Sequence, residues 1–349
     1  MNIAVLFGGI SPERNVSING GKAVCRALKS LGHHVFSIDP AYGTDCLIDI
    51  ENLEIPNRPP TKEELAKFDK RNYIDCINSP VFDDIDVAFI VLHGENGEDG
   101  KIQALLEMRG IKYTGSNIKA SALAIDKNSS KMMFTAAGII TPPWGMINKA
   151  DIGNFDYYKS LRDDFGGEMV IKPNDQGSSI GVTIINDGNL DDIGDAIVEA
   201  FKYSDSVIVE KFIEGREITV PIIGDEAYPV IEILPEDGFY DYSHKYSKGK
   251  SNYICPAEMT EDIEEFIQTM AESAFSALGC SGFARADFRL TDESQPFLME
   301  MNTIPGFTAT SLVPMSAKLM GIEFPELCQR IIDIALGVVK DKEEQEEEV

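Results

Sequence analysis

Two carboxylates and an amide near the end of the chain have the spacing of a metal site. Asp287 lies in the segment RADF, and Glu300 and Asn302 lie in LMEMN. Alternate residues of a strand face the same side, so Glu300 and Asn302 share a face, to which a neighbouring strand can add Asp287. Oxygen ligands of this kind suit Mg²⁺, which completes its shell with phosphate and water. The alternative is that one of the three caps a turn, and for Asp287 alone both interpretations remain open.

A second group of charged residues points to nucleotide binding. Lys172 ends a predicted strand and precedes the loop QGSSIG (176–181), whose amides and hydroxyls can surround phosphate oxygens. A tight hairpin with a surface lysine explains this pattern equally well. Glu210 and Lys211 end another predicted strand, and Glu217 follows six residues after Lys211, a spacing that suits adenine and ribose. Taken alone, a solvated charge cluster explains these three residues better.

The common nucleotide-binding signatures are incomplete. Residues 249–251 (GKS) match the end of a Walker loop, but His244 stands where that loop requires a glycine. The pair Gly8-Gly9 does not extend to a dinucleotide fingerprint, because no further glycine occurs before Gly20. These gaps argue against a Rossmann dehydrogenase.

The charge balance and the cysteines limit the possible partners. The chain has 31 Lys and Arg against 58 Asp and Glu, and its net charge of −27 argues against nucleic acid or an anionic membrane as a partner. The six cysteines show neither a metal-ligand spacing nor a disulfide framework. The chain opens without a basic leader, and its apolar runs are too short to span a membrane. We therefore expect a soluble, cytoplasmic protein.

The elements that position these residues differ along the chain. In the first third, apolar runs predict buried parallel strands at 3–7, 35–39 and 87–94. The apolar spacing between Val24 and Leu31 predicts a helix that Ser17 caps. Alternation of strand and helix predicts an open α/β sheet. Residues 43–80 are polar and weakly periodic, which predicts an insertion on the rim of that sheet.

The chain changes character after Pro142 and Pro143, where close-spaced strands predict an antiparallel α+β layout. The predicted strands are 169–173, 181–185, 207–213, 217–223, 228–234, 284–290 and 297–302. The predicted helices are 119–137, 190–203, 260–279 and 315–339. The acidic end DKEEQEEEV predicts a solvated tail.

Several sequence blocks, taken together, indicate a family resemblance that no single motif indicates. They are GGISPERNVS (8–17), LHGENGEDG (92–100), YTGSNIKASALAIDK (113–127), IKPNDQGSSIGV (171–182), FYDYSHKY (239–246), GFARADF (282–288), MEMNTIPGFT (299–308) and SLVP (311–314). In this order they resemble the D-alanine:D-alanine ligase family of the ATP-grasp superfamily.

The resemblance implies an α/β and α+β protein, in which an ATP-grasp fold follows an N-terminal domain with an open parallel sheet. The implied limits are 1–117 for the N-terminal substrate-binding domain, 118–215 for the central ATP-grasp domain, 216–340 for the C-terminal domain with the magnesium and substrate site, and 341–349 for the tail. It further implies a homodimer that uses ATP and two Mg²⁺ or Mn²⁺ ions. The implied reaction joins two D-alanine molecules through D-alanyl phosphate, for peptidoglycan precursor synthesis.

The resemblance also assigns roles to individual residues. Those matched to the first substrate and its oxyanion are Glu13, His93, Arg285 and Gly306. Those matched to the second substrate and the closing loop are Ser178, Lys245, Tyr246 and Ser311. Those matched to ATP are Lys127, Lys172, Glu210, Lys211 and Glu217. Those matched to magnesium are Asp287, Glu300 and Asn302.

Three positions bear on the choice of acceptor. Tyr246 favours an amine acceptor, because related ligases that make D-alanyl-D-lactate typically lack this tyrosine. Asn15 replaces an acid and Ile304 replaces a small residue of the family pattern, which leaves room for a different second substrate. D-serine or D-lactate is therefore the alternative acceptor. A nucleotide-binding protein without ligase activity is a third hypothesis.

Overall fold

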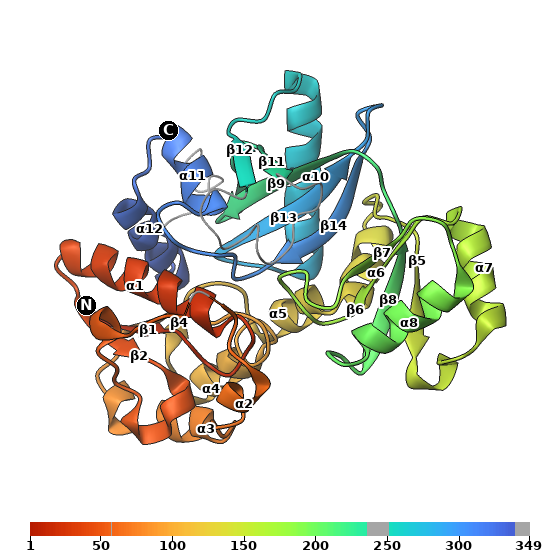
Figure 1. Ribbon diagram of the computed structural model, residues 1–349. Coiled ribbons are helices and arrows are strands. Elements are labelled where there is room, and N and C mark those ends of the chain that lie inside the picture. Colours follow the sequence, from red (N-terminus) through yellow and green to blue (C-terminus); the bar gives the residue numbers. More distant parts are fainter. Residues whose placement is uncertain (57, 236–250, 339–349) are drawn as a thin grey trace.

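The computed structural model describes residues 1–56, 58–235 and 251–338, so the predicted tail at 341–349 lies outside it. Its strands form three sheets with helices packed against them (Figure 1). The helices are α1 (Arg14–Ser30), α2 (Lys62–Leu65), α3 (Asn72–Ile77), α4 (Lys101–Arg109), α5 (Ile118–Ile125), α6 (Lys127–Ala136), α7 (Phe155–Phe165), α8 (Leu190–Ala200), α10 (Glu261–Leu278), α11 (Leu312–Leu319) and α12 (Phe324–Leu336). In the described ranges, none of them is long and apolar enough to cross a membrane.

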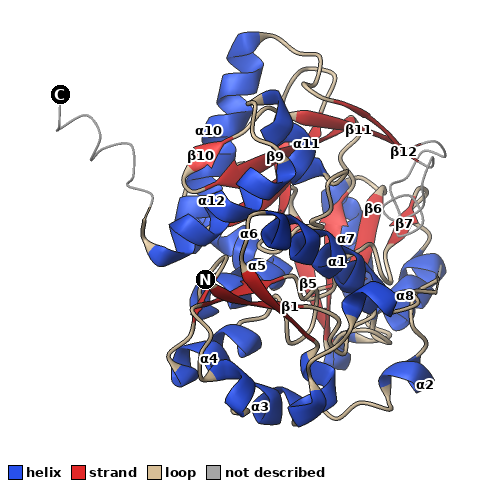
Figure 2. Ribbon diagram, turned by 90° about the vertical axis from the view of Figure 1, so that its left-hand side faces the viewer, coloured by secondary structure: helices blue, strands red, loops and turns tan. Residues whose placement is uncertain are grey.

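The first sheet is parallel throughout, in the order β2-β1-β3-β4. Its strands are β1 (Asn2–Leu6), β2 (His34–Ile38), β3 (Val87–Ile90) and β4 (Lys112–Tyr113). Ile3 and Val5 pack toward α1, whereas Ala4 and Leu6 pack toward α3 and α4. The helices therefore cover opposite faces of the sheet (Figures 1 and 2), which explains the continuous apolar run of β1. The predicted open parallel sheet is confirmed.

The start of α1 differs from the prediction. The helix begins at Arg14 with Glu13 as its N-cap residue, so Ser17 lies inside the first turn and is not the cap. The Ser17 hydroxyl accepts a hydrogen bond from the Gly8 amide (2.8 Å) and donates one to the Val91 carbonyl (2.6 Å). Ser17 therefore fastens the helix to the ends of β1 and β3, a tertiary role that local spacing does not reveal.

The prediction for residues 43–80 is wrong in part. This stretch contains α2, α3 and short 3₁₀ turns, and the α3 residues Tyr73, Cys76 and Ile77 are buried in the core under the first sheet. The stretch looked polar because only a few of its side chains enter that core. It is therefore a packed part of the fold and not only an addition to its rim.

The second and third sheets are antiparallel, as predicted. The second has the order β5-β8-β6-β7 and is covered by α7 and α8. The third has the order β12-β11-β9-β13-β14, with β10 paired to β9, and α10 packs on it. The strands are β5 (Trp144–Asn148), β6 (Met169–Pro173), β7 (Thr183–Ile185), β8 (Ser206–Lys211), β9 (Arg216–Ile223), β10 (Glu226–Ala227), β11 (Ile231–Pro235), β12 (Ser251–Ile254), β13 (Phe283–Leu290) and β14 (Pro296–Asn302).

Two helices predicted as continuous are each broken in two. The predicted helix 119–137 divides at Asp126, whose extended backbone ends α5 and whose side chain caps α6 through the Ser129 amide (2.7 Å). The predicted helix 315–339 divides between α11 and α12, where Gly321 has a positive φ of 79° and Pro325 enters the first turn of α12. Each break lets the chain turn a corner on the surface of a sheet.

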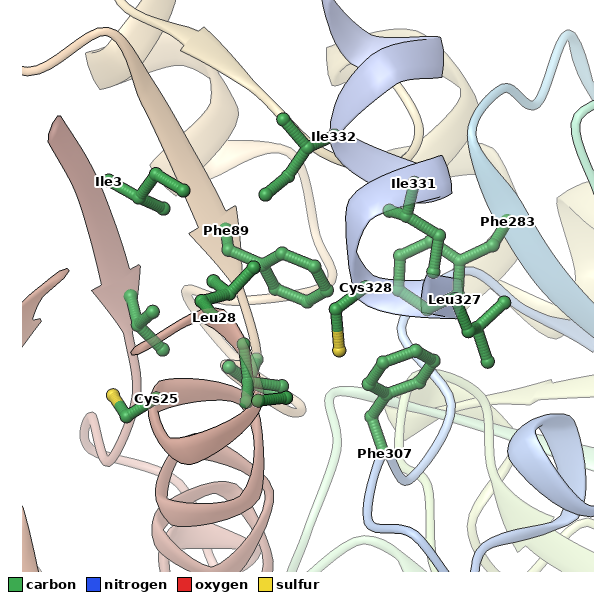
Figure 3. Close-up of a cluster of buried hydrophobic side chains, with 14 of the residues drawn as sticks. Ile3, Cys25, Leu28, Phe89, Phe283, Phe307, Leu327, Cys328, Ile331 and Ile332 are labelled. Carbon is green, nitrogen blue, oxygen red and sulfur yellow. The ribbon is translucent and has the colours of Figure 1, made fainter. Parts of the chain in front are cut away.

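One hydrophobic core joins the two ends of the chain (Figure 3). Phe89 of β3 packs against Phe283 of β13 and Phe307, with ring centroids 6.5 Å and 5.8 Å away. Leu327 and Ile331 of α12 belong to the same cluster. The loop after β14 is thus anchored against the first sheet. The domain limits at 117 and 215 stay predictions, although each sheet lies within one predicted domain.

Candidate active site

Four polar side chains line one face of the third sheet. In the register of β13 and β14, Arg285 is opposite Asn302 and Asp287 is opposite Glu300. The register shifts after Asp287, where Met299 is the extra residue of a bulge. The intervening residues of β13 are buried on the other face. The predicted juxtaposition of Asp287 with Glu300 and Asn302 is therefore present.

The Asp287 carboxylate is the centre of this group. It accepts two hydrogen bonds from Arg285 (both 2.7 Å), one from the Thr219 hydroxyl (2.6 Å) and one from the Asn302 amide (2.8 Å). It therefore does not cap a turn. Thr219 comes from β9, on the other side of β13. Three strands thus fix the position of one carboxylate.

These residues fit a magnesium site that is completed by its ligand. In the part of the chain that the structure describes, no three His, Cys, Asp or Glu side chains gather as metal ligands. The set here is two carboxylates and one amide, Asp287, Glu300 and Asn302. Mg²⁺ commonly binds one or two carboxylates and takes its remaining oxygens from water and phosphate. The donor set therefore suits a cation that arrives with a nucleotide.

Buried lysines face this sheet from α6 and β6. Lys127 lies 3.4 Å from Glu300 and donates to the Gln176 carbonyl (2.7 Å), which connects the Gly- and Ser-rich loop to the carboxylate face. Lys172 pairs with Glu210 (2.8 Å), whose side chain is completely buried. Two of the residues matched to ATP phosphates, Lys127 and Lys172, are thus held in place by carboxylates.

The sequence did not single out Lys131, which pairs with the other oxygen of Glu210 (3.1 Å) and donates to Thr141 (2.7 Å). Burial lowers the pKa of Lys131 to about 8, although the Glu210 carboxylate opposes this shift. Burial on its own would raise the pKa of Glu210, but Lys131 and Lys172 together hold it below its usual value. The Glu210 side chain thus orders two lysines. The fully buried position of Lys131 was not visible in its helical spacing.

The other two residues matched to ATP lie further out. Lys211 ends β8 and its side chain is exposed. Glu217 of β9 is opposite Arg289, with 4.0 Å between carboxylate and guanidinium, and it alternates with Thr219 on the face of Asp287. Glu217 therefore shares the polar face, whereas Lys211 lies at the end of the neighbouring sheet.

Glu13 and Ser178 come from opposite ends of the first half of the chain and meet in the structure. The Ser178 hydroxyl donates a hydrogen bond to the Glu13 carboxylate. Ser178 has a positive φ of 51°, and a Cβ at either Gly94 or Gly177 would lie 3.2 Å from Glu13 Oε2. The backbone therefore closes tightly around a carboxylate that is itself only 6% exposed. The resemblance predicted these two residues for one site, and the structure brings them together.

His93 is buried, and the charges of both Glu13 and Arg285 act on it. Burial lowers its pKa, and the nearby Glu13 and Arg285 act on it with opposite signs. Its Nε2 is buried without a hydrogen-bond partner among the described residues. The lowered pKa favours a neutral imidazole, whose Nε2 remains able to bond a ligand.

Glu98, which the sequence analysis did not single out, lies beside this histidine. Its carboxylate accepts a hydrogen bond from the Gly94 amide (2.6 Å) and makes a looser contact with the Ile304 amide. Burial, followed by the charge of Glu13, raises its pKa to about 8. Its only sequence signal is its position between glycines in LHGENGEDG.

The loop after β14 carries Gly306 and Ser311. Ser311 is the N-cap residue of α11, and its hydroxyl accepts from the Thr308 amide (2.9 Å). A Cβ at Gly306 would lie 3.8 Å from the Ser311 hydroxyl, so these two residues are close. The Ile304 side chain is buried in the core under the first sheet, so it does not face a second substrate. Lys245 and Tyr246 lie outside the described residues.

Two family models cover most of the chain. The model for the "D-ala D-ala ligase N-terminus" matches residues 2–116, and the model for the "D-ala D-ala ligase C-terminus" matches residues 133–333. The chain belongs to the D-alanine:D-alanine ligase family. The mixed architecture, with a parallel first sheet and two antiparallel sheets, is the ATP-grasp fold expected for this family.

Relatives of this ligase family resemble the chain over nearly its full length. The D-alanine–D-alanine ligase of Methylacidiphilum infernorum is 40% identical over 334 residues, 96% of this chain and 95% of the relative. The D-alanine–D-alanine ligase of Bacillus anthracis, solved in complex with ATP, has a TM-score of 0.75 at 30% identity and covers 100% of both chains. The VanG D-Ala:D-Ser ligase of Enterococcus faecalis has a TM-score of 0.75 at 28% identity, covering 96% of this chain and 99% of that one.

Proposed function

We propose that this enzyme is an ADP-forming ligase that joins two D-alanine molecules for peptidoglycan synthesis. The observation that carries the proposal is the strand register that places Arg285, Asp287, Glu300 and Asn302 on one face. His93, which interacts with both Arg285 and Glu13, connects that face to the predicted first-substrate site. Family membership supports the substrate class.

In the first step, a carboxylate oxygen of D-alanine attacks the γ-phosphorus of ATP, and ADP leaves. Lys127 and Lys172 are proposed to hold the phosphates. This is supported by the carboxylates that order both lysines and by the hydrogen bond from Lys127 to Gln176 in the 176–181 loop. Asp287, Glu300 and Asn302 would hold the divalent cation, which supplies positive charge to phosphate oxygens when bound. The product is D-alanyl phosphate.

In the second step, the amine of another D-alanine attacks the carbonyl carbon of D-alanyl phosphate. The amine loses a proton, and phosphate leaves. Glu13 is proposed to bind the ammonium of the first substrate, since its buried carboxylate has no lysine or arginine within ion-pair distance among the described residues. Arg285 and the Gly306 amide are proposed to stabilise the oxyanion. Ser311 is proposed to hold the second carboxylate, together with Lys245.

The direct test is a product assay. Purified protein supplied with ATP, Mg²⁺ and D-alanine should release phosphate and form the dipeptide in equal amounts. L-alanine in place of D-alanine is the matched control. Phosphate release with L-alanine and none with D-alanine would contradict the proposal, and ATP binding without turnover on a panel of amino acids would favour a protein that only binds nucleotide.

A D-serine or D-lactate acceptor is the second candidate, favoured by the similarity to the D-Ala:D-Ser ligase. Product analysis of the competition between D-alanine and each alternative identifies the preferred acceptor, and its pH dependence separates the two amines from D-lactate. An amine must lose its proton before it attacks, so its use increases with pH more steeply than that of a hydroxy acid. Preferred use of D-alanine supports the main proposal.

We also infer a homodimer that works in the cytoplasm. The cysteines, all unpaired, are compatible with a reducing compartment, where ATP is also available. The family resemblance supports the dimer. Sedimentation equilibrium tests the oligomeric state, and a single monomeric species would contradict it.

A further inference from the structure

A buried ion pair lies directly behind the turn that carries Glu13. Arg14 donates one hydrogen bond to Asp39 (2.5 Å) and another to the Gly9 carbonyl (2.6 Å). Asp39 is fully buried, and the Arg14 side chain is 9% exposed. A buried ion pair is often no more stabilising than apolar residues of the same volume. Stability alone is therefore a weak reason for charges at this position.

The turn is wrapped around the Asp39 carboxylate. Its Oδ1 accepts hydrogen bonds from the amides of Gly9 and Ala41, both at 3.1 Å. Gly8 has a positive φ of 78°, and a Cβ there would collide with this carboxylate and with Arg14. The backbone of the turn can approach the ion pair so closely only because glycine lacks a side chain.

Residues 43–80, together with Tyr42 just before them, support the same turn. The Phe68 ring lies 4.7 Å from the Arg14 guanidinium carbon, and the Tyr42 ring lies 5.7 Å from it. The Tyr73 hydroxyl accepts a hydrogen bond from the Ile10 amide (3.0 Å). Aromatic faces attract a guanidinium, so these rings favour the observed direction of Arg14.

We propose that Arg14 and Asp39 are a positioning pair for Glu13. Asp39 engages the cation that is next to Glu13 in the sequence and directs it away from the Glu13 carboxylate. The same pair fixes the Gly9 amide and carbonyl, and with them the turn that ends in Glu13. The Glu13 carboxylate therefore stays available to a substrate ammonium. This inference rests on the proposed role of Glu13 in binding the first D-alanine.

Asp39→Asn, Arg14→Met and the double variant Arg14→Met/Asp39→Asn test the pair. The measurements are the KM for D-alanine, the KM for ATP and the thermal unfolding midpoint. Each single variant should raise the KM for D-alanine by roughly tenfold or more, because a charge-assisted contact to the ammonium weakens. The double variant should recover unfolding temperature, since no buried charge remains unpaired, while its KM for D-alanine stays high.

A purely structural pair predicts a different result. Recovery of both unfolding temperature and the KM for D-alanine in the double variant would overturn the proposal. An equal rise in the KM values for ATP and D-alanine would also overturn it, because that indicates general damage. Tyr73→Phe removes one hydroxyl from the support of the turn, so it keeps the test available if a charge variant does not fold. It should raise the KM for D-alanine about threefold, and an unchanged KM would count against the proposal.

Arg26→Met is the matched control. Arg26 lies on the same helix and forms an ion pair with Glu51 at 2.6 Å, but both side chains are exposed. The variant should leave both KM values and the unfolding temperature unchanged, because an exposed ion pair contributes little. Dipeptide formation by the unmodified enzyme tests the proposed function separately. The pair is tested only by the ratio between the KM for D-alanine of each variant and that of the unmodified enzyme.

Discussion

Two carboxylate groups of this ligase have opposite environments. Asp287 and Glu300 are partly exposed, and each lies within ion-pair distance of a protein cation, at 2.7 Å from Arg285 and 3.4 Å from Lys127. Glu13 and Glu98 are only 6% and 7% exposed. In the described parts of the chain, neither has a lysine or arginine within that distance, and hydroxyl and amide groups hold them instead.

The difference shows how each group is completed. The exposed group already contains its counter-charges, and a divalent cation with phosphate can replace or rearrange them. In the buried group, burial and then the charge of Glu13 raise the pKa of Glu98, so two ionised carboxylates are costly to keep there. A ligand with an ammonium group supplies the missing positive charge. The proposed amino-acid site and the proposed metal–phosphate site thus differ in the charge that each would take from its ligand.

Arg285→Met should have the largest effect. It removes the guanidinium that holds Asp287 and that we propose to stabilise the oxyanion. The kcat should fall by roughly 10²-fold or more, with a much smaller change in ATP affinity. Steady-state kinetics and nucleotide titration measure the two quantities. Arg330→Met, which breaks an ion pair with Glu226, is the control, and full activity of Arg285→Met would disprove the assigned role.

Glu300→Gln should weaken binding of the magnesium nucleotide. It removes one of two carboxylates from this group and leaves Lys127 without its carboxylate partner. We expect the Mg²⁺ concentration for half-maximal activity to rise by about tenfold or more. A Mg²⁺ titration at fixed ATP measures this. Glu293→Gln, on the exposed turn of the same hairpin, should behave as the unmodified enzyme. Equal titration curves for all three proteins would count against the metal site.

Glu13→Gln should affect D-alanine and not ATP. The amide keeps the size of the side chain but removes the charge that the buried group offers to an ammonium. The KM for D-alanine should therefore rise by about tenfold, while the KM for ATP changes little. Initial rates at varied concentrations of each substrate separate these effects. Glu51→Gln, which alters an exposed ion pair, is the control. A rise in the KM for ATP alone would refute the distinction between the two groups.

Glu98→Gln should change how stability depends on pH. The pKa of Glu98 is raised from 4.5 to about 8, so the folded protein binds a proton more tightly than the unfolded chain. The contribution of Glu98 to stability is therefore complete below about pH 4.5 and is lost as pH rises through about 8. Glutamine cannot titrate. As pH rises from about 5 to about 8, the unfolding temperature of the variant should therefore increase relative to that of the unmodified enzyme.

Scanning calorimetry at several pH values across this range measures the difference. Glu95→Gln provides the control, because Glu95 lies in the same turn but is exposed and paired with Lys70. Parallel profiles for Glu98→Gln and the unmodified enzyme would show that Glu98 is already ionised throughout this range.

The position of the partly exposed group, Asp287 and Glu300, was easier to predict from the sequence than that of the buried group, Glu13 and Glu98. Strand alternation alone placed Glu300 with Asn302, and it allowed Asp287 on an adjacent strand, because the period of a strand does not depend on tertiary packing. The break of the helix at Asp126 was missed, because the apolar pattern continues across it. The break at Gly321 had a local signal, the glycine followed by Pro325, which the helical pattern outweighed.

Local sequence patterns were not enough to predict the buried group. Glu13 and Ser178 are 165 positions apart, and only the family resemblance joined them in advance. Lys131 and Glu98 were missed because a charged residue on a helix or in a turn is usually solvated. Their burial depends on how three sheets meet, which residue spacing does not encode.

The aromatic packing of Phe89, Phe283 and Phe307 has a consequence for the architecture of the chain. A polypeptide that started after the first sheet would still contain the metal–phosphate residues. It would also expose Phe283 and Phe307 to water and leave the segment with Gly306 unsupported. The opening third of the chain therefore supports the loop that carries Gly306, through the contact of Phe89 with Phe283 and Phe307.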